Sequence, residues 1–211
     1  MKIHQLPRAS FLALVARLGG AAGWPARNHG PTDNFDGTVC FSNTASGLVA
    51  WEPRTLHGHY FFVAAEEVRW DIFPTRCLVD TLLTPGPGWQ RAGEVEFLAR
   101  DLATFPPVPM TEPIVERKPE SSYGQHWLKT PLATVAWTER DGIYLGRWWE
   151  ARHPRAAALL LGQALSQAQG RGCREARTWV ARDNAASLAI HEAMGFRPTG
   201  VTWPRWRKTE T

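Results

Sequence analysis

Basic side chains concentrate at two places in the C-terminal part of this sequence. One group of arginines lies between Arg147 and Arg155, and a second lies between Arg171 and Arg177, with Arg182 shortly after it. The guanidinium group is planar, always charged and able to pair with two oxygens of a phosphate or carboxylate. Such a cationic patch suits nucleic acid, an acidic substrate or a phosphorylated cofactor. The residues around the arginines have to show which of these ligand classes the patch binds.

The second group of arginines leads into a predicted strand, helix start and helix over residues 177–196. Asp183 or Asn184 can cap this helix by accepting hydrogen bonds from the free NH groups of its first turn. In a parallel β–α–β unit, such a helix start points its NH groups into the gap at the strand ends. Gly195 supplies the left-handed exit from the helix. Four apolar residues fall on one predicted face at helical spacing: Ala186, Ala189, Ile190 and Ala193.

This segment also resembles the signature of a known family. The string V-x-x-x-N-x-x-S-x-x-I-H-x-x-M-G-F, from Val180 to Phe196, is similar to the helix and GF turn of the GNAT (Gcn-related N-acetyltransferase) superfamily. With the order of strands and helices, the resemblance covers about residues 130–206. It implies an α+β fold with a mixed, mostly antiparallel central sheet flanked by helices, and an elaborated N-terminal half. It also implies transfer of an acyl group from acetyl-CoA to a primary amine.

The resemblance assigns roles to two residues of the string. In the family, the Asn side chain binds near the pantetheine arm, and the residue seven positions later, usually Tyr, protonates the departing thiolate. These positions hold Asn184 and His191 in this sequence. An imidazole can also donate a proton, so the resemblance makes His191 the candidate general acid. A histidine on the helix surface or hydrogen-bonded in the core is the alternative.

A phosphate loop of the family form R/Q-x-x-G-x-G/A falls on residues 152–157. Arg152 and Ala157 match this pattern, but Arg155 stands in place of the middle glycine. An arginine there either blocks the approach of backbone NH groups or pairs with phosphate directly. The resemblance therefore implies cofactor binding by Arg152, Arg155, Ala156 and Ala157. A helix start with solvated arginines is the structural alternative.

The residues Leu145, Gly146 and Arg147 lie where the family has a bulged strand whose backbone pairs with pantetheine. Gly146 is compatible with such a bulge. A backbone NH group of this segment would donate to the developing oxyanion. Trp148 and Trp149 follow, and they either form a wall of the cofactor site or pack beneath the next helix.

The family chemistry also needs a base that deprotonates the attacking ammonium group, usually a carboxylate or a water chain. Glu150 and Asp141 flank the strand that would line the site, and they are the candidate catalytic bases. A solvated surface charge is the alternative for each. Further acidic residues are available from the N-terminal half: Glu66, Glu67 and Asp71.

Turn signals and hydrophobic periodicity predict the elements that position these residues. In the first half, we expect a meander of strands at 38–41, 48–51 and 60–64, and helices at 9–20, 71–83 and 94–104. The second half is predicted to hold strands at 132–138, 143–148, 177–181 and 201–206, and helices at 155–169 and 184–194. Five prolines between residues 105 and 119 indicate an extended connector. We therefore divide the chain into an acceptor-side half, 1–119, and an acyl-CoA-binding core, 120–211.

Composition narrows the remaining classes of function. Apolar runs are too short to cross a bilayer, and three scattered cysteines favour a reducing, cytoplasmic environment over a disulfide scaffold. His57 and His59 lack a third ligand at metal-site spacing, so we expect no metal. The basic residues are not interleaved with aromatic ones, which disfavours nucleic acid. The expected acceptor is a small-molecule or peptide amine, a homodimer stays open, and the alternative function is a non-catalytic GNAT-fold protein that binds a ligand or partner in the same cleft.

Overall fold

The computed structural model describes residues 38–43, 48–53, 60–64, 68, 70–109 and 126–209. Contacts between residues divide the chain into two compact units. The first unit combines the described residues up to Val95 with those from Thr202 onward, and the second extends from Glu96 to Val201. Two long strands contribute to both units, namely β5 (Trp89–Asp101) and β10 (Arg197–Lys208). The predicted boundary at residue 119 lies outside the described residues.

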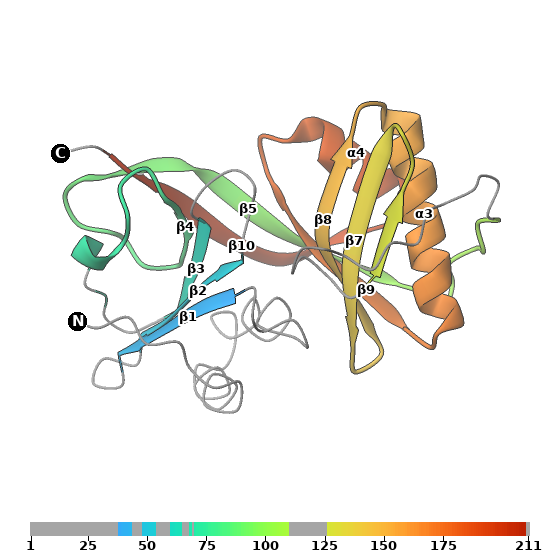
Figure 1. Ribbon diagram of the computed structural model, residues 1–211, viewed down its shortest axis with the longest axis horizontal. Coiled ribbons are helices and arrows are strands. Elements are labelled where there is room, and N and C mark those ends of the chain that lie inside the picture. The colour runs from blue at the N-terminus through green and yellow to red at the C-terminus, as the bar shows by residue number, and fades with distance from the viewer. Residues whose placement is uncertain are drawn as a thin grey trace. The chain divides into compact units, whose positions relative to one another are not determined.

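The first unit is built on short strands. They are β1 (Thr38–Asn43), β2 (Leu48–Pro53), β3 (Tyr60–Ala64) and β4 (Leu78–Asp80), with a 3₁₀ turn over Trp70–Ile72. The pairs β1–β2 and β2–β3 are antiparallel, which confirms the predicted meander. The next strand, β4, pairs in parallel with β3 and antiparallel with the C-terminal part of β10 (Figure 1).

A small aromatic core holds this first unit together. Val63, Phe73, Cys77 and Val79 are buried, and Trp70 and Trp89 pack against them. The ammonium group of Lys208 donates to the main-chain carbonyl of Phe73 at 2.6 Å, and so ties β10 to the turn that precedes β4. Burial of such aromatic rings provides much of the stability of a small core.

The second unit contains a mixed, mostly antiparallel sheet. Its further strands are β6 (His126–Lys129), β7 (Ala133–Arg140), β8 (Ile143–Ala151) and β9 (Glu175–Ala181), and its strand order is β10-β5-β9-β8-β7-β6. A tight turn joins β7 to β8, as predicted. Its two residues, Asp141 and Gly142, have φ values of 52° and 75°, which suit the two-residue turns that match strand twist. This architecture agrees with the predicted α+β class.

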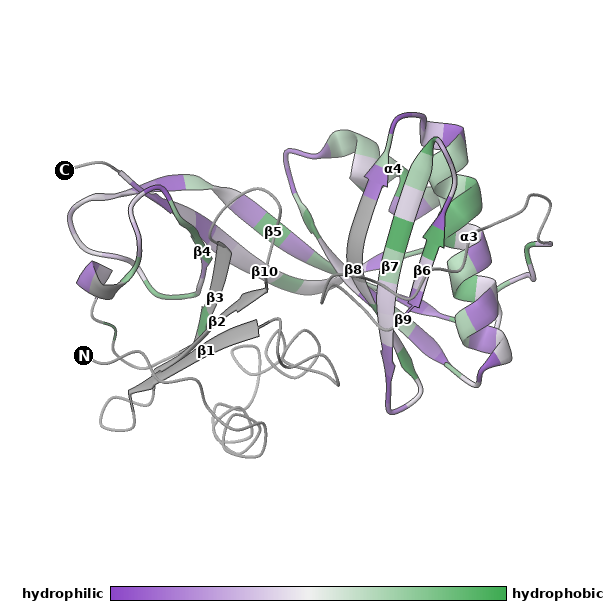
Figure 2. Ribbon diagram, viewed as in Figure 1, coloured by the Kyte–Doolittle hydropathy of each residue, from purple (hydrophilic) through white to green (hydrophobic). Residues whose placement is uncertain are grey.

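Two helices accompany this sheet, α3 (Pro154–Gly170) and α4 (Ala185–Ala193). The buried face of α3 repeats at helical spacing, with Ala157, Leu161, Ala164 and Leu165 among its members, and it packs on the core of β7 and β8. Figure 2 shows apolar and polar residues on different sides of α3. Within the described residues, no helix is long and apolar enough to cross a bilayer.

The chain between β5 and residue 109 is extended and packs along α3, consistent with the connector predicted there. The Gln169 side-chain amide donates to the carbonyl of Leu102 at 2.6 Å, and the Ser166 hydroxyl accepts from the Val108 N–H at 2.7 Å. A Cβ at Gly162 would lie 3.1 Å from Val108, so the small residue permits this close approach. Polar residues on one stripe of α3 thus satisfy backbone groups of the connector.

Two predicted helices are wrong. The segment 94–104 lies mostly in β5, where Val95 and Phe97 are fully buried and alternate with less buried neighbours. This is the period of a strand, and sheet pairing stabilises it. The segment 71–83 holds the end of the 3₁₀ turn and β4 instead, because the short apolar run of β4 pairs with strands on both sides. The strand β6 was not predicted, and the helix predicted at 9–20 lies outside the described residues.

Candidate functional site

The parallel pairing of β8 with β9 is short. Among the described residues, the register ends at Leu145 opposite Arg177, although both strands continue beyond these positions. Backbone groups of a strand seek hydrogen-bond partners wherever the neighbouring strand no longer supplies them. The separation of β8 from β9 therefore leaves a place where an extended ligand can pair with the main chain.

A β-bulge in β8 lies at this point of separation. Trp137 of β7 is opposite Gly146, whereas Ala136 is opposite Trp148, so Arg147 is the extra residue. A bulge bends the strand and changes the direction of its backbone groups. The bulge that the sequence predicts at this position is confirmed.

Gly146 keeps the two strands close just before they separate. A Cβ at this position would lie 2.9 Å from the Thr178 hydroxyl oxygen and 3.2 Å from the Thr178 Cβ. Both distances are shorter than ordinary contacts between such atoms, so any larger residue would force Thr178 to move. Sequence reasoning missed Thr178. The side chains of Arg147, Trp148 and Trp149 lie outside the described part of the structure, and their roles stay predictions.

The predicted phosphate loop forms the N-cap and first turn of α3. The cap is His153, whose Nδ1 accepts from the Arg155 N–H at 3.3 Å and whose carbonyl accepts from the Ala157 N–H at 3.1 Å. Pro154 has no N–H to offer. Few backbone donors therefore remain for a phosphate at this helix start. The exposed side chains of Arg152 and Arg155 supply the positive charge instead.

A pocket of about 400 Å³ lies beside this helix start, between α3 and the turn that joins β6 to β7. The Arg152 N–H donates to the Leu132 carbonyl at 2.8 Å and holds this turn against the loop before α3. Arg155 and Ala156, both predicted site residues, line the pocket. Leu132 and Leu159, which sequence reasoning missed, line it with side chains that stay 49% and 38% exposed.

The second helix start is capped as predicted. The Asn184 side-chain oxygen accepts from the Ser187 N–H at 3.1 Å. The predicted apolar face of α4 is wrong, however, because Ala186, Ala189 and Ala193 are exposed. The buried face is rotated by one residue, which is about 100° on a helix. It presents Ser187 and His191, which are 3% and 4% exposed.

His191 is therefore a buried residue whose surroundings determine its charge. Its Nδ1 lies 2.8 Å from the Ser187 carbonyl oxygen, and its ring packs edge-on against Phe196. Burial lowers the pKa of the imidazole, and the hydrogen bond to Ser187 opposes this effect in part. With its hydrogen on Nδ1, a neutral ring presents Nε2 as an acceptor. Donation of a proton from Nε2 then requires the charged imidazolium.

The structure does not bring the two candidate bases together. Glu150 is exposed near the end of β8, close in sequence to the start of α3. Asp141 lies in the turn before β8, with a side chain that is 82% exposed and 3.3 Å from Arg140. A nine-residue strand spans about 30 Å, so these carboxylates lie at opposite ends of β8. Asp71 is exposed in the first unit, and Glu66 and Glu67 lie outside the described residues.

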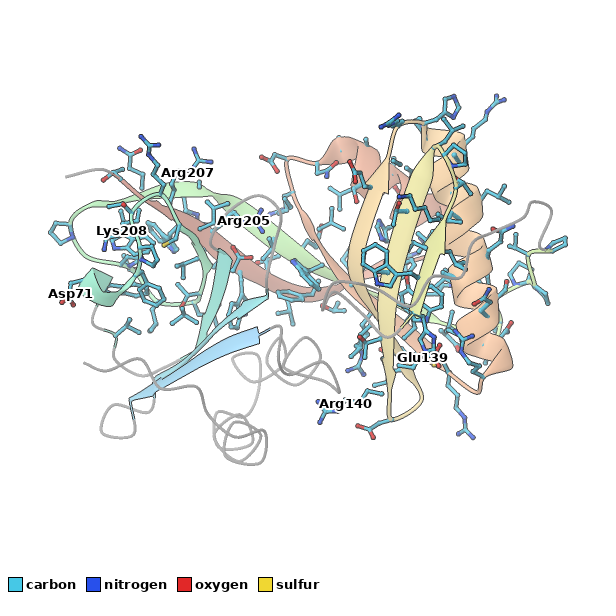
Figure 3. All side chains as sticks on the ribbon, in the orientation of Figure 1. Asp71, Glu139, Arg140, Arg205, Arg207 and Lys208 are labelled. Carbon is cyan, nitrogen blue, oxygen red and sulfur yellow. The ribbon has the colours of Figure 1, made fainter. Side chains whose placement is uncertain are left out.

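A partly buried carboxylate that sequence reasoning missed is Glu139 on β7 (Figure 3). It accepts from the Trp137 indole N–H at 2.9 Å and from the Arg171 Nε–H at 2.8 Å. The His126 ring lies 3.6 Å away. Because several donors already hold this carboxylate, it serves as a structural anchor for the end of α3 rather than as a free base.

Metal ligands do not gather in the described part of the chain. No group of three His, Cys, Asp or Glu side chains there is arranged to hold an ion. His57 and His59 lie outside the described residues. The candidate site thus consists of the separating strands β8 and β9, the bulge, and the capped starts of α3 and α4.

Comparison with solved structures of known proteins shows the fold of this chain. No family model and no curated protein matches the sequence. A GCN5-related N-acetyltransferase from Kribbella flavida superposes with a TM-score of 0.54 at 16% identity, over 92% of this chain and 97% of that one. A second, from Sphaerobacter thermophilus, gives 0.51 at 15% identity, over 97% and 94%. Identities this low show likeness of fold alone. The chain therefore has the fold of the GNAT superfamily of N-acetyltransferases.

Proposed function

We propose that this protein is an N-acyltransferase that takes an acetyl group from acetyl-CoA and transfers it to a primary amine. The observation that carries the proposal is the bulge at Arg147, placed where β8 stops pairing with β9. A pantetheine arm is an extended chain with two amide groups. It can therefore pair with main-chain groups of β8 and β9 beyond the point where these strands stop pairing with each other. No other place in the described sheet combines a bulge with parallel strands that separate.

The chemistry assigned to this site is direct transfer. The amine nitrogen attacks the thioester carbon, the C–S bond breaks, and the thiolate takes up a proton. A main-chain N–H near the bulge donates to the carbonyl oxygen as negative charge develops there. Glu150 is the better placed of the two candidate bases, because Asp141 lies at the other end of β8. The acceptor is proposed to be a small-molecule or peptide amine.

The nucleotide end of the cofactor is assigned to the start of α3. Since the ring and the carbonyl of His153 already accept from the N–H groups of Arg155 and Ala157, charge–charge contacts from Arg152 and Arg155 would hold the phosphates. We expect Arg152→Gln and Arg155→Gln each to weaken acetyl-CoA binding about ten-fold at low salt, and less at high salt. Isothermal titration at two ionic strengths measures this. Unchanged affinity in both variants would remove the phosphates from this helix start.

Catalysis is tested by release of free thiol. The protein is incubated with acetyl-CoA and a panel of primary amines that includes amino acids, peptides with free N-termini, polyamines and amino sugars. We expect thiol release that depends on one amine class and falls at least ten-fold in Glu150→Gln. Matched Asp141→Asn should retain wild-type turnover, because the turn residue lies far from the bulge. Binding of acetyl-CoA without amine-dependent release would refute the catalytic proposal.

One observation favours a second candidate, a non-catalytic protein that binds an acyl-CoA or a partner through the same cleft. His191 occupies the position of the predicted acid, yet it is buried and its pKa is lowered. A neutral imidazole that donates its Nδ1–H to the Ser187 carbonyl carries no hydrogen on Nε2. It therefore has no proton on Nε2 to pass to a thiolate. The thiol-release assay separates this candidate from the enzyme.

The predicted cytoplasmic location belongs to the same proposal. Cys173 is buried and forms no disulfide bond with a described residue, which agrees with a reducing environment. Burial raises the pKa of Cys173 to about 11, so its thiol is unreactive.

A further inference from the structure

One pocket of the second unit lies next to the helix start that is assigned to the cofactor phosphates. It is the pocket of about 400 Å³ between α3 and the turn that joins β6 to β7. Pockets that bind small molecules measure about 300–1,000 Å³, so this one suits a single ring system rather than a whole cofactor. Arg155 lines the pocket and is also one of the two arginines proposed to hold the phosphates. A group joined to those phosphates through a short linker is therefore within reach of the pocket.

The pocket offers apolar surface that is open to solvent. Three large apolar side chains stay exposed among the described residues, and two of them, Leu132 and Leu159, line this one pocket. Single exposed leucines are common, but two that line one cavity indicate a surface for an apolar group. Among the described lining residues there is no acidic side chain that would neutralise Arg155.

The turn between β6 and β7 holds Leu132 in a fixed position. The Thr130 hydroxyl accepts from the N–H groups of Leu132 and Ala133 at 3.2 and 3.0 Å. The Leu132 carbonyl in turn accepts from the Arg152 N–H at 2.8 Å. This wall of the pocket is therefore formed by the fold itself, before a ligand binds.

The other wall is one side of α3. Arg155, Leu159 and Gln163 follow one another at intervals of four residues, which places their side chains in one row along the helix. With a rise of 1.5 Å per residue, Arg155 and Gln163 lie about 12 Å apart along the helix axis. Arg155 is exposed, whereas Gln163 is only 1% exposed. The row therefore leads from a charged, open end of the pocket to a polar, buried end.

Gln163 presents an acceptor at this buried end. Its side-chain N–H donates to the carbonyl of Pro109 at 3.3 Å. Because a carbonyl only accepts, the amide nitrogen has to face Pro109, and the amide oxygen is left for the pocket. In the part of the chain that the structure describes, no N–H or O–H group donates to this oxygen. A buried acceptor without a donor is costly, so a ligand with an N–H group at the end of an apolar body fits the pocket best.

From these observations we infer that the pocket binds the adenine ring of acetyl-CoA, with its amino group donating to Gln163 and its faces against Leu132 and Leu159. Adenine has two apolar faces and an amino group on its edge, and a glutamine amide is a suitable partner for that amino group. The inference rests on the proposed function, because it takes the phosphates to lie at Arg152 and Arg155. The acetyl group does not compete for the pocket, since it is assigned to the bulge at the other end of the pantetheine arm.

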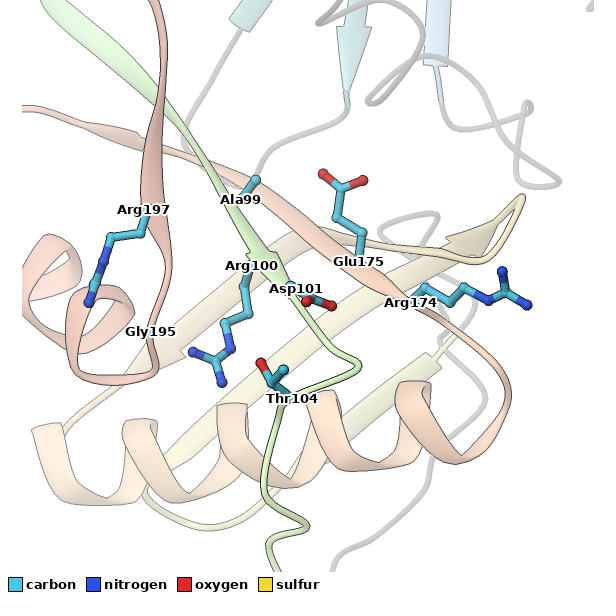
Figure 4. A pocket seen from close by; sticks show the side chains of 8 residues that line it. All are labelled: Ala99, Arg100, Asp101, Thr104, Arg174, Glu175, Gly195 and Arg197. Carbon is cyan, nitrogen blue, oxygen red and sulfur yellow. The ribbon is translucent and has the colours of Figure 1, made fainter.

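A larger pocket in this unit, of about 590 Å³, is a poorer place for the nucleotide. Figure 4 shows that Arg174 points away from Arg100 and Arg197 there, so the three guanidinium groups do not converge. Arg174 also follows the C-terminal end of α3, and the 17 residues of this helix separate it from the helix start by about 25 Å. Adenine is joined to the phosphates through one ribose and does not reach that far.

The test is isothermal titration of the full chain with acetyl-CoA and with its deaminated analogue, in which hypoxanthine replaces adenine. The analogue keeps the phosphates and the thioester, but it has a carbonyl oxygen in place of the amino group and so presents an acceptor to Gln163. We expect the wild type to bind the analogue about ten-fold more weakly than acetyl-CoA. Gln163→Met keeps the size of the side chain but loses the amide oxygen, and it should bind the two ligands equally. Circular dichroism and the melting temperature check that this variant folds.

A second variant tests the apolar wall without disturbing a buried residue. Leu159→Gln changes an exposed side chain of α3, so the protein should fold, and acetyl-CoA binding should weaken about five-fold. Leu82→Gln is the matched control. It changes the exposed leucine of the first unit and should leave acetyl-CoA binding unchanged.

The outcomes separate this inference from the proposed function. Equal affinity of the wild type for the two ligands would overturn the adenine site and leave acetyl-CoA binding itself intact. Discrimination that persists in Gln163→Met, or a Leu159→Gln variant that binds as tightly as Leu82→Gln, would also overturn it. No binding of acetyl-CoA by the wild type would refute the proposed function, and the adenine site with it.

Discussion

The two fully buried residues of α4, Ser187 and His191, are polar, while Leu188 and Ile190 are partly buried against the core. The Asn184 cap could be predicted from the sequence, because a cap needs only a short polar side chain before a helical pattern. The burial of His191 could not, since a one-residue rotation of α4 moves it from the rim to the core. The role of His191 as an acid stays a prediction, and its surroundings favour the neutral ring.

The lowered pKa of His191 predicts a pH dependence of stability. The folded protein binds this proton more weakly than the unfolded chain does, so the free energy of unfolding falls as the pH drops below about 6.5. Urea unfolding at pH 7.5 and 5.5 should show a larger loss for the wild type than for His191→Phe. Asp80, whose pKa burial raises to about 6 against the opposing effect of Arg205, changes both proteins equally. Equal losses in the two proteins would contradict the account.

Elements with a strong period were predictable and the others were not. The hairpin of β7 and β8 carries a tight-turn signal, and the helix α3 carries a long apolar stripe. In β5, the alternation of Val95 and Phe97 is interrupted by Leu98, which is also buried, so the run resembles a helix. The extent of the pairing between β8 and β9 could not be deduced, because it depends on Gly146 meeting Thr178 from a distant strand.

Gly146 is predicted to be essential for the geometry of β8. In Gly146→Ala, the new Cβ meets Thr178 at 2.9 Å and forces β8 and β9 apart, which should destabilise the protein by about 1–3 kcal/mol. Thr178→Ala in the same chain should recover part of the loss, because it removes the closest atom. Equilibrium urea unfolding measures both variants. Gly86→Ala, where the new Cβ has no neighbour within 4 Å, is the control and should change stability by less than about 0.5 kcal/mol. A Gly146→Ala variant as stable as this control would contradict the close packing.

At the scale of the whole molecule, each compact unit joins segments that are far apart in sequence. In the first unit, Asp80 on β4 and Arg205 on β10 form a two-point ion pair, with N–O distances of 2.9 and 3.1 Å. Asp80 is fully buried. No local pattern predicts such a pair, because its partners are brought together only by the pairing of β4 with β10. The division of the chain at β5 and β10 escaped prediction for the same reason.

Removal of Arg205 should therefore destabilise the first unit. Arg205→Met removes the guanidinium charge beside the buried Asp80 carboxylate, and we expect a loss of about 3 kcal/mol at pH 7.5. The loss should shrink at pH 5.5, because a protonated Asp80 needs no counter-charge. Urea unfolding at both pH values measures this, with exposed Arg207→Met as the matched control. A loss no larger than that of the control would show that the pair adds nothing to stability.

The central claim is that acetyl-CoA lies between the separating ends of β8 and β9. Hydrogen–deuterium exchange of the full chain, with and without saturating acetyl-CoA, tests this most directly, because bound ligand slows exchange of the amides that it covers. We predict protection in residues 146–158 and 178–188, and unchanged exchange in residues 98–104, at the end of β5 and just after it. Absence of protection in both predicted segments, at acetyl-CoA concentrations up to about 1 mM, would contradict the account.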